Sequence, residues 1–202
     1  MLALLWIGSL VFAYLLGAIP NGLLIARARG VDIRTVGSGN IGATNVFRAV
    51  GKGWGILTFF CDALKGFVPS FLFPLLVSSQ FGEELDYLGV ACAAAAVAGH
   101  NWPVYLKFKG GKGVATTAGA LLGIAPAAMG IGVAVWVVAT FSTRYVSVGS
   151  ILAAAAVPVA AWVLYRQDDL VLPCVLTLIG AVVIWRHRAN IQRLASGNEN
   201  RF

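Results

Sequence analysis

The sequence predicts an all-α integral membrane protein with seven transmembrane helices, short interfacial helices and glycine-rich loops on the cytoplasmic side. Of its 202 residues, 59% are hydrophobic and only 11% are charged, whereas a soluble domain usually carries about 25% charged residues. The apolar residues are gathered in long runs, as in segments that cross a bilayer. We therefore expect one membrane domain that covers residues 1–202.

Seven apolar segments follow one another along the chain, and an untilted span needs about 20 apolar residues. The third and fourth are shorter, so the third has to lengthen beyond Gly99 and the fourth crosses only part of the bilayer. Alternatively, Pro126 kinks one long helix, which leaves six spans. The segments are 2–26, 54–78, 86–99, 113–125, 126–142, 147–165 and 169–185.

The first segment begins at Leu2 without a preceding basic residue, which predicts a membrane span and not a cleaved signal peptide. Cys61, Cys92 and Cys174 lie inside apolar segments, without a metal-ligand spacing or a disulfide framework. We expect them to be small buried hydrophobic residues.

The basic residues decide between six and seven spans. With seven spans, the loops 27–53, 100–112 and 143–146 share one side with the tail 186–202, and they hold all 15 lysines and arginines except Lys65 and Arg166. Basic loops stay in the cytoplasm. We therefore predict a bacterial inner-membrane protein with its N-terminus outside and its C-terminus inside, because six spans would put the arginine-rich tail outside. The acidic residues on the opposite side are Glu83, Glu84, Asp86, Asp168 and Asp169.

The net charge of +7 does not indicate nucleic-acid binding, because the basic residues flank apolar runs. Asp62 and Lys65 form a charged pair inside the second segment, three residues apart on one helix face. Charges inside a membrane are costly and are usually paired or functional. The pair is either a structural ion pair or the support of an active site.

The first informative loop runs from Gly37 to Arg48. Glycines let backbone N–H groups turn towards a ligand, and an arginine offers a planar fork suited to phosphate. A helix that starts near Ile41 would also favour an anion at its N-terminus. The alternative is a flexible loop at the membrane edge. The candidate ligand-binding residues are Ser38, Gly39, Asn40, Thr44, Asn45 and Arg48.

The second loop lies within residues 99–116 and ends in Gly-Gly-Lys-Gly directly before an apolar helical segment. This arrangement is typical of phosphate-binding loops, although the spacing of a Walker A motif is missing. The alternative is a basic loop held by anionic lipid headgroups, which would not need the glycines. The candidates here are His100, Lys107, Lys109, Gly110, Gly111, Lys112 and Gly113.

Two further stretches lie on the same side. Residues 142–150 form either a tight turn or part of the site. In the tail 187–199, Ile191 and Leu194 form an apolar stripe that predicts a helix lying along the membrane, with a simple membrane anchor as the alternative. The candidates are Ser147, His187, Arg188, Asn190 and Glu199.

Together these loops predict an anion-binding site, and phosphate fits best. Only Asp32 and Glu199 are acidic in the loops 27–53, 100–112 and 143–146 and the tail 186–202, so a Mg²⁺ site built from carboxylates is not expected. We predict no metal and no cofactor. A phosphate or anion transporter remains the alternative function, although its usual related halves are not recognisable in the sequence.

Residues 38–45, 99–116 and 187–199 closely resemble the three signature motifs of the bacterial acyl-phosphate-dependent glycerol-3-phosphate acyltransferases. The resemblance extends over nearly the whole chain in length, motif order and span layout. It implies transfer of a fatty acyl group from acyl phosphate to the 1-hydroxyl of sn-glycerol 3-phosphate. The products would be lysophosphatidic acid and phosphate, in the first step of phospholipid biosynthesis.

The only departure in these motifs is harmless, since Ala189 occupies the variable place of a His-Arg-x-Asn pattern. Another acyltransferase family carries His-x-x-x-x-Asp, but Tyr105 and Gln192 stand five residues after the two histidines. Acyl phosphate is already activated, so positioning and charge stabilisation suffice without a covalent nucleophile. The chain should therefore use the acyl-phosphate mechanism.

The expected catalytic residues are His187, Asn190, Lys107 and Ser38. Ser38 is expected to bind phosphate and not to act as a nucleophile, and the proton acceptor is either His187 or a substrate phosphate. The expected partners are acyl phosphate entering sideways from membrane lipid, glycerol 3-phosphate from the cytoplasm and, as a candidate, the enzyme that forms acyl phosphate.

Overall fold

The computed structural model describes residues 1–82, 85, 87–168 and 170–201, and all its elements there are helical. The predicted external acidic residues Glu83, Glu84, Asp86 and Asp169 lie outside the described residues. The chain divides into two compact units, Met1–Ile124 and Ala125–Phe202. The single membrane domain over residues 1–202 stays a prediction.

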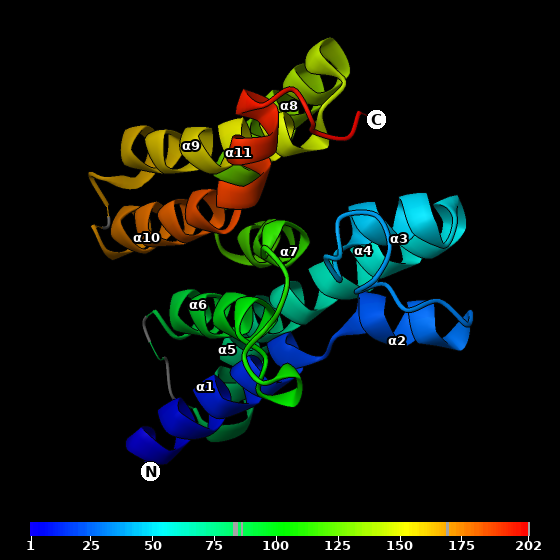
Figure 1. The fold of residues 1–202 in the computed structure, drawn as a ribbon. Helices are drawn as coiled ribbons and strands as arrows, with labels where there is room; N and C mark the ends of the chain where they lie inside the picture. Colours follow the sequence, from blue (N-terminus) through cyan, green and yellow to red (C-terminus); the bar gives the residue numbers. More distant parts are fainter. Residues whose placement is uncertain (83–84, 86, 169, 202) are drawn as a thin grey trace. The chain divides into compact units, whose positions relative to one another are not determined.

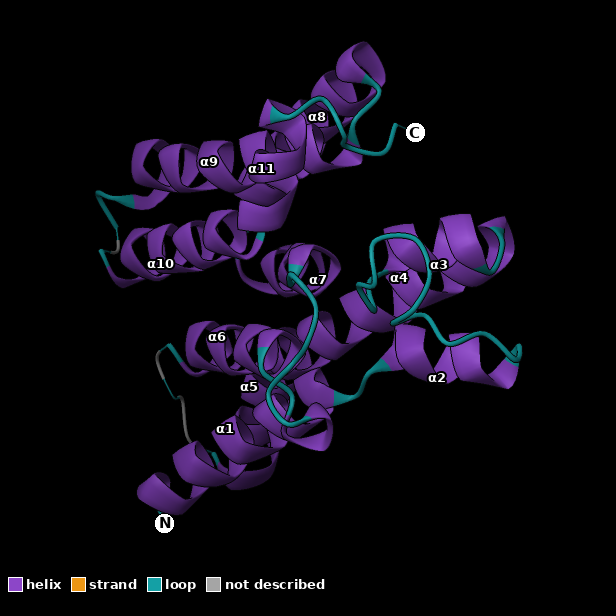
Figure 2. Cartoon of the chain, in the orientation of Figure 1, coloured by secondary structure: helices purple, strands orange, loops and turns teal. Residues whose placement is uncertain are grey.

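The first unit carries the first four apolar segments and both glycine-rich loops (Figures 1 and 2). Pro20, which follows α1, cannot continue the helical hydrogen-bond pattern, so the first apolar segment is divided into two helices. The helices are α1 Leu2–Ala18, α2 Asn21–Ala28, α3 Ala43–Ala49, α4 Lys52–Phe67, a π-helical turn Val68–Leu72, α5 Phe73–Phe81, α6 Leu88–Asn101, a 3-10 turn Val104–Leu106 and α7 Val114–Ile124.

In the described part of the second unit, three apolar helices precede a short terminal one, and α9 packs against both α8 and α10 (Figure 1). Pro126 begins a new helix directly after Ala125, so residues 113–143 do not form one kinked helix. The helices are α8 Pro126–Thr143, α9 Val146–Tyr165, α10 Val171–Arg186 and α11 Arg188–Ala195.

The apolar segments predicted from the sequence are all helical, but not all are long enough to span. Among the described residues, four helical stretches are long and apolar enough to cross a membrane, and a fifth counts if α10 and α11, bent by 51°, form one broken span. α7 is apolar but has only 11 residues. The chain is thus a helical membrane protein, while the seven-span count stays a prediction.

The distribution of side chains is that of a protein in lipid. Large apolar residues face outwards, among them Leu4 at 75% exposed and Val163 at 73%. Small residues fill the helix contacts instead: a Cβ on Gly17 would collide with the backbone of Ala96, and one on Gly119 with the carbonyl of Ala63. Without a hydrophobic force between helices in lipid, such close backbone approach holds them together.

Candidate functional site

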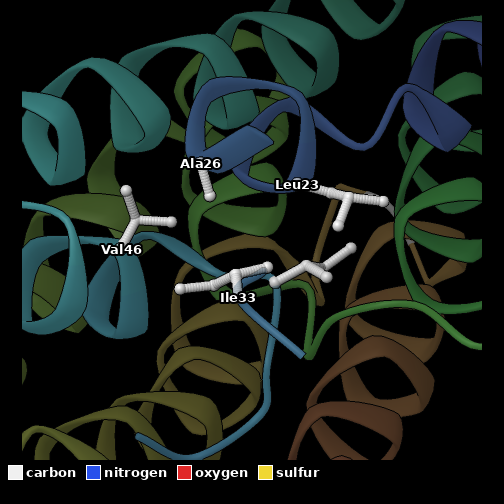
Figure 3. Close-up of a cluster of buried hydrophobic side chains, with 5 residues drawn as sticks. Leu23, Ala26, Ile33 and Val46 are labelled. Atoms are coloured by element: carbon white, nitrogen blue, oxygen red, sulfur yellow. The ribbon is translucent and has the colours of Figure 1, made fainter. Parts of the chain in front are cut away.

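The first loop, residues 31–42, is held over a small apolar core. Leu23 and Ala26 from α2, Ile33 from the loop and Val46 from α3 bury their side chains against one another (Figure 3). Ile41 completes this cluster. Both ends of the loop are therefore fixed by apolar contacts.

Asn45 organises the same loop by hydrogen bonds. Its carboxamide, 3% exposed, donates to the carbonyl oxygens of Ile33, Val36 and Asn40 at 3.2, 3.1 and 2.9 Å. Its Oδ1 accepts the Ser38 N–H at 3.0 Å. These bonds fix the turn that carries Ser38, which is itself exposed.

The second loop turns back onto the end of α6. The N–H groups of Gly110 and Gly111 donate to the carbonyl oxygens of Asn101 and His100 at 3.2 and 3.0 Å. A Cβ on Gly110 would collide with the His100 carbonyl, and one on Gly111 with the His100 imidazole. Only glycine lets the backbone lie this close to the helix. The loop then leads through half-buried Lys112 and Gly113, at φ +84°, into the N-terminus of α7.

We call residues 110–113 the glycine loop. Asn101 lies beside it: a Cβ on Gly113 would come within 3.1 Å of its Oδ1. Asn101 is fully buried, and neither amide atom has a hydrogen-bond partner within the described part of the chain. The hydroxyl of Thr116, on the first turn of α7, is also buried without a hydrogen-bond partner among the described residues.

One arginine connects the two loops. The Arg34 guanidinium donates to the carbonyl oxygen of Lys109. Partial burial lowers the pKa of Arg34 from its ordinary value, against the opposing effect of Asp32. Lys107 and Lys109 are exposed, and Lys107 and Phe108 adopt left-handed backbone angles that turn the chain sharply towards Lys109. The first unit thus presents Ser38 and several lysines on connected loops.

Three buried polar residues, Asp62, Lys65 and His100, lie beside the glycine loop together with half-buried Asn21, and we call these four residues the Asp62 cluster. The Asp62 carboxylate Oδ1 accepts from Lys65 Nζ at 2.9 Å and from Asn21 Nδ2 at 3.1 Å. It also lies 3.9 Å from His100 Nδ1. Lys65 Nζ donates in addition to the carbonyl oxygen of Ile19 at 2.7 Å. The pairing of Asp62 with Lys65 is confirmed, while its role, structural or in support of an active site, stays a prediction.

In the second unit, Glu199 gathers three partners, which together form the Glu199 cluster. Its Oε1 accepts from Ser147 Oγ at 2.9 Å and from Asn190 Nδ2 at 2.7 Å, and its Oε2 from Arg193 Nε at 2.7 Å. Its side chain is only 5% exposed. Burial alone would raise the pKa of Glu199, but the three hydrogen bonds and the charge of Arg193 lower it below its ordinary value.

His187 lies at the bend between α10 and α11 and is 2% exposed. Its Nδ1 is 2.8 Å from the carbonyl oxygen of Val183. A carbonyl can only accept, so Nδ1 carries a proton and Nε2 of the neutral ring is an acceptor. In this tautomer, a neutral ring could accept a proton on Nε2.

The structure places the predicted residues in two groups, one per unit. The first unit brings the loops around Ser38 and Lys112 together, while the second brings Ser147, Asn190 and Glu199 into one cluster. Arg48 and Arg188 are exposed, Arg188 lying over the Trp185 ring at 4.5 Å. Gly39, Asn40 and Thr44 remain half-buried in the first loop and the start of α3.

Sequence reasoning did not select Asn21, Arg34 or Arg193 as functional residues. Arg34 and Arg193 were visible as basic residues next to candidate motifs, but their partners are set by loop folding. The predicted apolar stripe of the tail fits α11, where Ile191 is 43% exposed. Asn21 gave no signal beyond its place after Pro20.

Comparisons with known proteins agree on one family. The model of the glycerol-3-phosphate acyltransferase family matches residues 7–197. The glycerol-3-phosphate acyltransferase of Syntrophotalea carbinolica is 49% identical over 194 residues, 96% of this chain and 95% of the relative. That of Aquifex aeolicus is 44% identical over 195 residues, covering 95% and 96%.

Solved structures lead to the same family. The glycerol 3-phosphate form of PlsY (YgiH), an integral membrane glycerol 3-phosphate acyltransferase, superposes with a TM-score of 0.87 at 42% identity, covering 98% of this chain and 95% of that one. Its lysophosphatidic acid form gives 0.84 at 41% identity, with the same coverage. The chain therefore belongs to the glycerol-3-phosphate acyltransferase family and is an integral membrane acyltransferase.

Proposed function

We propose that the protein transfers a fatty acyl group from acyl phosphate to the 1-hydroxyl of sn-glycerol 3-phosphate. The reaction releases lysophosphatidic acid and inorganic phosphate. Two of the similar solved structures are forms with glycerol 3-phosphate and with lysophosphatidic acid, which supports this acceptor and this product. Membership in an acyltransferase family leaves no reason to retain the transporter alternative.

The observation that carries the proposal is the glycine loop. No Cβ fits at Gly110 or Gly111, Lys112 lies between two glycines, and α7 starts directly after them. The N–H groups of Gly110 and Gly111 are bonded to the end of α6, so the lysine and the N-terminus of α7 are the groups of this loop that favour a phosphate group. We assign this loop, with Lys112 and the Ser38 hydroxyl, to acyl phosphate.

The glycerol 3-phosphate residues are proposed to be Arg48, Lys107, His187 and Asn190. In the reaction, the glycerol 1-oxygen forms a bond with the acyl carbon while the bond from that carbon to the phosphate oxygen breaks. N–H donors stabilise the negative charge on the carbonyl oxygen. The proton of the 1-hydroxyl goes either to His187 Nε2 or to a substrate phosphate. Ser147 and Glu199 hold Asn190 in place, which is a supporting role.

We further propose the seven-span topology in the bacterial inner membrane, with the N-terminus outside and the loops in the cytoplasm. The distribution of lysines and arginines supports this orientation. Acyl phosphate would enter sideways from the lipid, while glycerol 3-phosphate would arrive from the cytoplasm. The enzyme that forms acyl phosphate is a proposed partner.

The direct test is incubation of the purified protein with palmitoyl phosphate and labelled glycerol 3-phosphate. Lysophosphatidic acid should form without coenzyme A or acyl carrier protein. Product formation that occurs only with acyl-coenzyme A would refute the proposed donor. In the same assay, near-normal turnover of His187→Ala would exclude an essential histidine base and leave the substrate phosphate as the proton acceptor.

A further inference from the structure

We propose that Asp62 is a positioning residue for acyl transfer, acting on the glycine loop through His100. The inference rests on the proposed phosphate-binding role of that loop. The Asp62 cluster joins three parts of the chain: Asn21 at the start of α2, Asp62 and Lys65 on α4, and His100 near the end of α6. His100 contacts the glycine loop directly at Gly111.

The Asp62 cluster contains buried charged groups that helix packing alone does not require. Asp62, Lys65 and His100 are only 2%, 4% and 4% exposed, and buried charges are costly even when they are paired. Lys65 does have a local task, because it donates to the Ile19 carbonyl at the break between α1 and α2. A neutral donor could do the same, so the break alone does not require a carboxylate.

The carboxylate is fixed in place beside the imidazole. Asp62 Oδ1 accepts from both Asn21 and Lys65 and lies 3.9 Å from His100 Nδ1. That distance is too long for a direct hydrogen bond, but charge acts strongly over it in a protein interior. A carboxylate near Nδ1 favours the proton on that nitrogen, and Nε2 is then an acceptor.

The Nε2 edge of His100 is the edge that faces the loop. A Cβ on Gly111 would collide with this nitrogen, and the Gly111 N–H donates to the His100 carbonyl at 3.0 Å. The loop backbone therefore lies directly against the ring. The orientation and tautomer of the ring set where the Gly111 backbone can lie, and through it the positions of Lys112 and the α7 N-terminus, which are proposed to hold phosphate.

The kinetic test compares Asp62→Asn, His100→Gln, the double variant and Thr58→Val. Thr58 is a matched control, since it is fully buried on α4 and its hydroxyl donates to the Trp54 carbonyl. Asp62→Asn should raise KM for acyl phosphate and lower kcat/KM about 10- to 100-fold. The double variant should lose no more than about threefold beyond the worse single one, because both changes break one path.

An ion pair that only stabilises the fold would behave differently. It would lower the melting temperature of Asp62→Asn and leave KM as in the Thr58→Val control. Wild-type kinetic constants in Asp62→Asn, or losses that multiply in the double variant, would overturn the proposal. If Asp62→Asn does not fold, Asp62→Asn is combined with Lys65→Met, which removes both charges of the pair. The KM for acyl phosphate and kcat/KM of this variant are then judged in the same way.

A second readout needs no turnover. The chain has only two histidines, so ¹⁵N spectra of the imidazoles can be assigned with a His187→Ala sample. His100 should carry its proton on Nδ1 in the wild-type protein and lose that preference in Asp62→Asn. A wild-type ring protonated on Nε2 alone would contradict the proposal. A wild-type protein that shows this His100 tautomer but does not react with palmitoyl phosphate would instead count against acyl phosphate as the donor.

Discussion

Replacing Gly111 with alanine tests how closely the glycine loop must lie against α6. The new Cβ would collide with the His100 Nε2 and lie 2.9 Å from the ring carbons Cδ2 and Cε1, whereas ordinary contact begins at 3.4 Å. Those two carbons have to retreat by at least 0.5 Å (3.4 − 2.9), and the nitrogen by more. The ring is held by the Asp62 cluster, so we expect the loop to take up most of the shift.

A misplacement of about 1 Å can reduce activity about 100-fold, so we expect kcat/KM of Gly111→Ala to fall about 10- to 100-fold. The assay is lysophosphatidic acid formation from palmitoyl phosphate and glycerol 3-phosphate, with purified protein that elutes as one species in detergent. Gly53→Ala is the control, because a Cβ at this exposed position on α4 meets no atom within 4 Å. It should keep full activity and gain up to about 1 kcal/mol of stability.

The reasoning would be refuted by a Gly111→Ala protein with kcat/KM within about twofold of the wild type, well short of the loss expected from misplacement. That result would mean that the ring and the loop adapt to each other without cost. A loss of activity that also appears in Gly53→Ala would point to a general sensitivity of the assay.

Three further predictions concern other parts of the chain. Glu199→Gln should be less stable than the wild type at neutral pH. The difference should shrink as the pH falls below 4.5, the ordinary pKa of Glu199. The reason is that a carboxylate with a lowered pKa in the folded state stabilises the fold while it is ionised, and this stabilisation is lost when the group is protonated. Thermal melts of both proteins over this range check the sign, and a constant difference would contradict it. Gly119→Ala should cost about 1–3 kcal/mol by forcing α7 away from the Ala63 carbonyl, measured by detergent-phase unfolding. Asn45→Ala should remove the hydrogen bonds of the first loop and cost about 1–3 kcal/mol, and limited proteolysis should then cut residues 31–42 faster.

Much of the helical layout could be predicted from the sequence alone. The apolar run at 147–165 corresponds to α9, Val146–Tyr165, and Pro126 separates α7 from α8 as the seven-segment scheme requires. Such boundaries depend on local composition and on the missing N–H of proline. The break after α1 was missed, because the run 2–26 is mostly apolar and only the short sequence Pro20-Asn21-Gly22 indicates the break.

The candidate site was predictable as a set of motifs, because glycines, lysines and amides next to helices indicate anion binding wherever they occur. Their partners were not predictable. Glu199 accepts from Ser147, 52 residues away, and Arg34 reaches the Lys109 carbonyl 75 residues along the chain.

The sequence by itself therefore determined a helical membrane protein with glycine-rich basic loops, since composition is a local property, and the resemblance of its motifs to a known family implied the acyltransferase activity. Only the tertiary structure decided that His100 lies between Asp62 and Gly111. Such a contact depends on which helices approach closely enough, and small residues at their interfaces control that distance. It cannot be obtained from the spacing of residues along one chain segment.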